Sequence, residues 1–200
     1  VGNEVLYLEG DFFGPLDRTK TIAMKYGREN LKWFDTTCIH EERDSQRLLS
    51  CITIPGAGHL FNYEVTIADQ ISHHGKFNGN YAPPVLFSMT PAEELLTDGG
   101  EIVTIFGQNF GPNGPMDNWN IVTATYGDDA EKFPMTAVRF PAHTCNITQA
   151  NKEIQCRTNE GAGSLHNWLL YVSEQVNQMT SIISNKKLKL YKGEKAIYKK

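Results

Sequence analysis

The sequence predicts an all-β chain made of two tandem antiparallel β-sandwiches. Three observations point to this fold class: apolar residues alternate with polar ones, glycines and prolines interrupt the chain at short intervals, and the whole pattern occurs twice. No stretch beyond about ten residues shows the spacing of an amphipathic helix. With 200 residues, of which 40% are hydrophobic, the chain has room for two domains, each with its own core.

An internal repeat divides the chain into two halves. The sequence Gly-x-x-Phe-Gly-Pro at 10–15 recurs 97 residues later at 107–112. Other residues recur in the same order with shifts of 100 to 107, so only loop lengths differ. The matching pairs are Asp17 and Asp117, Tyr26-Gly27 and Tyr126-Gly127, Cys38 and Cys145, Cys51 and Cys156, Gly56-Ala57-Gly58 and Gly161-Ala162-Gly163, and Gln70 and Gln175. We therefore expect one fold to occur twice.

The expected elements follow in chain order. The first domain, 1–80, contains alternating segments around Val5 and at 62–67. Tyr81-Ala82-Pro83-Pro84 has the composition of a stiff extended connector. The second domain, 81–183, begins with a strand at 85–89, and 184–200 form a separate Lys-rich tail.

The first domain is expected to lack its own first strand. Its sequence starts at Val1-Gly2, which matches the glycine pair Gly99-Gly100, whereas the second domain has the strand at 85–89 before that pair. A sandwich without this strand has an unpaired edge and exposes part of its apolar core. We therefore predict an acceptor edge that includes Val5 and Tyr7.

The C-terminal tail differs from the rest of the chain in charge. Residues 186–200 hold seven lysines and one acid, a formal charge of +6, and the remainder of the chain carries −10. Three interpretations stay open: a solvated basic tail, a strand that folds back onto its own domain, and a strand donated to the vacant position of another copy. Donation would be heterologous and would produce a filament. The residues expected in the donor strand are Leu188, Leu190, Tyr191, Ile197 and Tyr198.

Several of these motifs resemble the IPT/TIG family of immunoglobulin-like domains. The most specific part runs from Asp98-Gly99-Gly100 through a short alternating strand to Gly107-Gln108-Asn109-Phe110-Gly111. The resemblance covers 83 to 178, and a truncated copy covers 1–80, with Asp11-Phe12 in place of Gln108-Asn109. It implies two tandem immunoglobulin-like β-sandwiches. Proteins similar to this occur as surface receptors, as extracellular modules and in some transcription factors, so the fold alone does not choose a function.

Four cysteines, two in each repeat, predict two local disulfides. Parity and repetition favour Cys38 with Cys51 and Cys145 with Cys156 over the other two connectivities; the alternative is four buried free thiols in a cytosolic protein. Asn146-Ile147-Thr148 is an acceptor sequence for an N-glycan, and the alternative is an unmodified loop.

The sequence offers no recognisable catalytic machinery. It lacks a Gly-x-Ser-x-Gly elbow, a His-Glu-x-x-His motif, a phosphate-binding loop and an EF-hand loop. A net charge of −4 argues against a nucleic-acid partner, and no apolar stretch approaches the ~18 residues of a membrane helix. We expect a mature soluble product that is not an enzyme, has no membrane span and holds no metal or cofactor other than an N-glycan.

These observations predict a secreted, non-enzymatic structural subunit that assembles head to tail with copies of itself. Each subunit would donate its C-terminal strand to the first domain of the next and so build an extracellular filament. The alternative is a recognition or adhesion module of a longer surface receptor ectodomain, which binds a protein or glycan.

Overall fold

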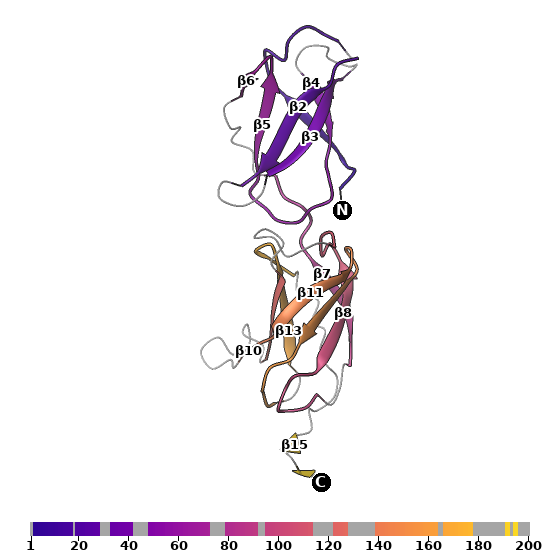
Figure 1. Cartoon of the computed structure of the whole chain (residues 1–200), viewed down its shortest axis with the longest axis vertical. Helices are drawn as coiled ribbons and strands as arrows, with labels where there is room; N and C mark the ends of the chain where they lie inside the picture. The colour runs from indigo at the N-terminus through magenta and orange to yellow at the C-terminus, as the bar shows by residue number, and fades with distance from the viewer. Residues whose placement is uncertain are drawn as a thin grey trace. The chain divides into compact units, whose positions relative to one another are not determined.

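The computed structural model describes residues 2–17, 19–28, 33–41, 48–72, 79–91, 95–113, 122–127, 139–163 and 166–177, with the backbone of 191–192 and 194–195. Within these ranges the regular structure consists of β-strands, and every pairing is antiparallel. The chain divides into two compact units, Val1–Tyr81 (unit 1) and Ala82–Lys200 (unit 2) (Figure 1). The predicted all-β class is confirmed.

Unit 1 is built on one continuous sheet. Its strands are β1 Val5–Glu9, β2 Ile22–Gly27, β3 Trp33–His40, β4 Leu48–Ile52, β5 Asn62–Ile67 and β6 Gln70–Ile71, in the order β1-β4-β3-β2-β5-β6. The long strand β3 pairs with β2 through its first part and with β4 through its last residues, and Cys38 belongs to both pairings. Strand β3 therefore connects the two parts of the sandwich, β1-β4 and β2-β5-β6.

Unit 2 has two separate four-stranded sheets. Its strands are β7 Val85–Thr90, β8 Ile102–Gln108, β9 Val122–Gly127, β10 Arg139–Pro141, β11 His143–Gln149, β12 Glu153–Arg157, β13 Asn167–Val172 and β14 Gln175–Val176. The sheet orders are β10-β9-β13-β14 and β11-β12-β8-β7. Strands β10 and β11 take the place of β3 and are separated at Ala142, whose N–H donates a hydrogen bond to the Ala124 carbonyl of β9 at 2.8 Å. Further along the chain, β15 Tyr191–Lys192 pairs with β16 Glu194–Lys195.

The core of unit 1 is a cluster of aromatic rings. Tyr26, Phe34, Phe61 and Tyr81 are all buried, and their ring centroids lie 5.2 to 6.5 Å apart. Aromatic pairs in this range add to the stability that burial alone provides. Because the Tyr81 ring lies in this core, unit 1 includes Tyr81 and ends one residue later than the predicted boundary at 80.

The two units repeat the same local backbone features. In each, a tyrosine hydroxyl receives a hydrogen bond from a backbone N–H: Ile54 to Tyr26 at 3.0 Å, and Asn159 to Tyr126 at 3.1 Å. Burial raises the pKa of both tyrosines, which keeps the hydroxyls neutral. These shared contacts show that the sequence repeat is also a structural repeat.

Both disulfides are present, and each joins directly opposed residues of neighbouring strands. Cys38 pairs with Cys51 across β3 and β4, and Cys145 pairs with Cys156 across β11 and β12. All four sulfur-bearing side chains are buried. Each disulfide therefore fixes the register of a strand pair within one sheet.

Candidate functional site

The most unusual feature of unit 1 is the edge strand β1. It pairs with β4 on one side, and among the described residues no strand pairs with it on the other. In unit 2 the matching strand, β8, lies between β12 and β7. The slot beside β1 is thus the one that β7 fills in unit 2.

Strand pairing shows which residues of β1 and β8 correspond. Leu6 lies opposite Cys51 as Val103 lies opposite Cys156. The next inward residue, Leu8, lies opposite Leu49, and its counterpart Ile105 lies opposite Ile154. The two strands therefore share one register, and a comparison of their exposure is a comparison of like positions.

The core residues of β1 are covered less completely than those of β8. Val103 and Ile105 have exposed fractions of 0% and 1%, whereas Leu6 and Leu8 are both partly exposed. In unit 2 the cover comes from β7, whose inward side chains Leu86 and Met89 are themselves buried. With no described strand on this side of β1, its apolar side chains stay partly in contact with water.

The loop after β1 shows the same difference in burial between the two units. Phe110 follows β8 and is fully buried, whereas its counterpart Phe13 is only partly buried. We name the surface formed by Leu6, Leu8 and Phe13 along the free edge of β1 the open slot.

The position next to Phe13 also differs between the units. In unit 2, Asn109 has a φ of +64° and its side-chain amide donates a hydrogen bond to the Pro83 carbonyl at 3.0 Å, which holds the chain that enters β7. In unit 1, Phe12 has a φ of +67° and is 96% exposed. A bulky residue in the left-handed region is uncommon, so the backbone shape is retained although the asparagine contact is not.

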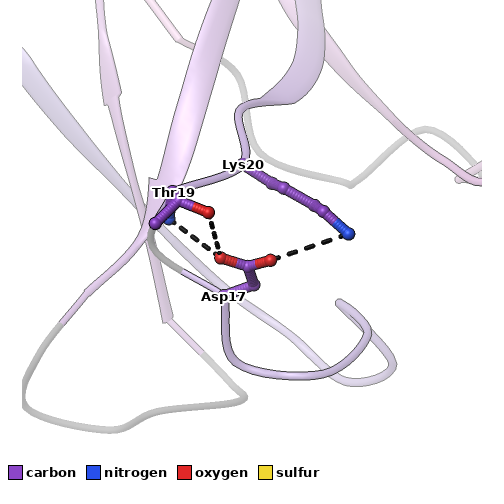
Figure 2. Close-up of polar contacts among 3 residues, drawn as sticks. All are labelled: Asp17, Thr19 and Lys20. Atoms are coloured by element: carbon purple, nitrogen blue, oxygen red, sulfur yellow. Dashed lines mark hydrogen bonds and ion pairs between the residues drawn. The ribbon is translucent and has the colours of Figure 1, made fainter.

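A compact turn holds the loop that leads from β1 to β2. The Thr19 N–H and hydroxyl both donate to Oδ1 of Asp17, at 3.0 and 2.6 Å, and the Lys20 ammonium lies 3.6 Å from Oδ2 (Figure 2). These bonds lower the pKa of Asp17, chiefly through the Thr19 hydroxyl. The turn is exposed to solvent and has a structural role, because it fixes where the loop with Phe12 and Phe13 returns to the sheet.

The predicted acceptor residues lie on β1, but on its outer face. Val5 and Tyr7 are 54% and 59% exposed, and the register places them on the side opposite the core. The residues that line the open slot are Leu6, Leu8 and Phe13, which are not among the predicted acceptor residues. The repeat matches them to Val103, Ile105 and Phe110, but the structure is needed to show that these three counterparts are buried.

The other predicted residues fall as follows. Asn146 lies on β11 with an exposed side chain, next to the buried Cys145. Of the donor residues, Tyr191 belongs to β15. The rest, Leu188, Leu190, Ile197 and Tyr198, lie outside the described residues.

The described part of the chain holds no cluster of three or more metal-ligating side chains, and none of its elements is a helix that could cross a membrane. No family model matches the chain, and no curated protein resembles it in sequence.

Proposed function

We propose that this protein is a secreted, non-enzymatic structural subunit, a tandem of IPT/TIG-like domains, that assembles head to tail by strand donation. The observation that carries the proposal is the open slot: partly exposed core residues lie along a β1 edge with no described neighbour. Burial of apolar side chains and pairing of free main-chain groups would both favour an added strand.

The C-terminal tail of a second copy is the proposed donor. Residues 187–190 alternate lysine and leucine, which gives a strand one apolar and one charged face. The tail carries +6 against −10 on the rest of the chain, so attraction favours the encounter of two copies.

Donation from one end of the chain to the slot at the other end is a heterologous contact. Such contacts need not close into a ring, and repeated donation then builds a filament. In this arrangement each subunit completes unit 1 of the next one.

Two further features support an extracellular setting. Disulfides persist in oxidising compartments, and both cysteine pairs are bonded here. Asn146 is exposed on a strand surface, as an N-glycan requires.

The deciding experiment compares three chains by size-exclusion chromatography and negative-stain microscopy. These are the intact chain, a chain that ends at residue 186, and a control in which residues 187–200 keep their composition in scrambled order. We expect filaments from the intact chain only, because the control keeps the charge of the tail and loses its alternation.

A stable monomer of the intact chain would overturn the proposal. It would favour the recognition module of a longer receptor, in which a preceding segment of the same chain supplies the missing strand. Filaments from the scrambled control would show that charge, and not a donated strand, drives assembly.

A further inference from the structure

The free edge of β1 has an alternating pattern that extends into the loop. Leu6 and Leu8 face the core side, and the residues between them face outward. After the strand ends at Glu9, the partly exposed Gly10 and the exposed Asp11 continue the alternation in exposure. Residues directly opposite in an antiparallel pair share a face of the sheet. The edge therefore specifies which face each donor residue must occupy.

Two exposed positions, at the end of β1 and just after it, are acidic in unit 1 and uncharged in unit 2. Glu9 and Asp11 are exposed where unit 2 has Phe106 and Gln108. In unit 2 these positions face β7, which contains no charged residue. The acids thus occur beside the open slot and are absent beside the slot that is already filled.

The tail has the complementary pattern. In Lys187-Leu188-Lys189-Leu190-Tyr191, lysines alternate with leucines at the same period of two. A strand that turns its leucines toward the core would present its lysines on the face that holds Glu9 and Asp11. Lysines opposite carboxylates are favourable cross-strand pairs, and two of them fix the register as well as the direction.

We infer that the tail of a second copy enters the open slot in one antiparallel register, selected by two charge pairs. This inference rests on the proposed function and names the contacts of that site. The register follows the direction of β7 against β8, where Leu86 lies opposite Gly107. It pairs Lys187 with Asp11, Leu188 with Gly10, Lys189 with Glu9, Leu190 with Leu8, and Tyr191 with Tyr7.

Gly10 has a specific place in this register. Its counterpart Gly107 approaches β7 so closely that an added Cβ would collide with the Val85 carbonyl oxygen. In unit 1 the atoms nearest to an added Cβ on Gly10 belong to the ring of Phe13, at 2.7 to 3.4 Å. A glycine at this point leaves room for a main chain that passes beside β1, as it does beside β8.

An alternative register would reproduce the irregularity in the pairing of β7 with β8. Strand β7 has an irregularity between Leu86 and Ser88, so that its two inward side chains, Leu86 and Met89, are three residues apart. A tail with the same bulge would turn Leu188 and Tyr191 inward and bring Lys192 opposite Tyr7. It would also place Leu190 opposite Glu9 and lose one of the two charge pairs, so the regular register is favoured.

Disulfide trapping distinguishes the two registers. The acceptor is a Tyr7→Cys chain that ends at residue 186, and it is mixed with donors that carry Leu190→Cys, Tyr191→Cys or Lys192→Cys. After mild oxidation we expect the cross-linked pair from Tyr191→Cys on a non-reducing gel, identified by mass spectrometry of the joined peptides. Preferential trapping of Lys192→Cys or of Leu190→Cys would overturn the register. The absence of any cross-linked pair would overturn it as well.

Charge reversal tests the two ion pairs. Electrostatic steering changes association rates by ~10- to 1,000-fold, so the Glu9→Lys, Asp11→Lys chain should elongate filaments at least about tenfold more slowly at low salt. Adding Lys187→Glu and Lys189→Glu to the same chain should restore the rate. The control reverses two exposed acids of unit 2, Asp98→Lys and Glu160→Lys, with the same change in net charge.

An equal slowing in the control, or failure of the combined variant to recover, would overturn the charge pairs. Failure of the proposed function is seen separately, because the unsubstituted chain would then form no filaments at all. Filaments that form with an altered register or without salt dependence would overturn only this inference.

Discussion

At the scale of single residues, backbone conformation and close packing explain why glycine occurs at particular positions. Gly99 and Gly100 both have positive φ, at +68° and +83°, yet their surroundings differ. A Cβ on Gly99 would collide with the backbone of Asn159 and Glu160, whereas a Cβ on Gly100 would meet nothing. Gly2 is the counterpart of Gly99 in unit 1, and a Cβ there would collide with the backbone of Ile54 and Pro55.

This difference gives a matched pair of substitutions. Gly100→Ala should lower the free energy of unfolding of unit 2 by about 1 to 2 kcal/mol, the cost of a side chain in the left-handed region. Gly99→Ala should cost more than this, since backbone atoms must also move. Hydrogen exchange of the β8 amides in increasing urea measures both, and equal effects would contradict the predicted collision.

A second residue-scale prediction concerns the Asp17 turn. Hydrogen bonds from Thr19 lower the folded pKa of Asp17 below its ordinary value of 3.8. The turn therefore contributes stability above pH 3.8, and the contribution is lost as the pH falls through the folded pKa. A Thr19→Ala chain should titrate closer to 3.8 in carboxyl-detected NMR, whereas an unchanged titration would show that the Thr19 hydroxyl is not the cause.

At the scale of elements, strand β7 of unit 2 has no counterpart among the described residues of unit 1. The disulfides, the tyrosine hydroxyl bonds and the two-residue turns at Ala68-Asp69 and Ser173-Glu174 occur in both. In unit 2, β7 pairs with the outer edge of β8. In unit 1, no described strand pairs with the outer edge of β1. The stability of unit 2 should therefore depend on β7 through its two inward side chains.

Truncation of one inward side chain of β7 tests this dependence. Leu86 is buried, so Leu86→Ala should cost about 2 to 5 kcal/mol of unfolding free energy through lost burial and a residual cavity. The adjacent Phe87 is 61% exposed, and Phe87→Ala should change stability by less than about 0.5 kcal/mol. Urea unfolding of both chains provides the comparison, and an equal loss in both would show that β7 is not a core strand.

At the scale of the whole molecule, the proposed assembly predicts that a donated strand protects β1 from local opening. Hydrogen exchange reports local opening, and an unpaired edge with a partly exposed core opens easily. In the chain that ends at residue 186, β1 amides should exchange much faster than β8 amides. In the filament, β1 should gain at least about a hundredfold in protection and β8 should stay unchanged.

That comparison has an internal control in β5, which lies between β2 and β6 and away from the open slot. Protection that rises equally in β1 and β5 would indicate general stabilisation of unit 1. Protection that rises in neither would mean that no strand enters the slot during assembly.

The sequence by itself determined the repeat, the all-β class and the cysteine pairing. Alternation and turn residues are local signals, and two cysteines in each copy constrain the pairing once the repeat is recognised. The two turns at Ala68-Asp69 and Ser173-Glu174 escaped prediction, because neither contains the glycine or asparagine that usually marks a positive-φ hairpin.

Only the tertiary structure decided which face of β1 matters. Alternation alone does not show which set of residues points inward, so Val5 and Tyr7 were as plausible as Leu6 and Leu8. The cross-strand neighbours settled it, because Cys51 and Leu49 are buried and lie opposite the two leucines. Burial depends on what packs above a strand, and that is a property of segments far apart in the chain.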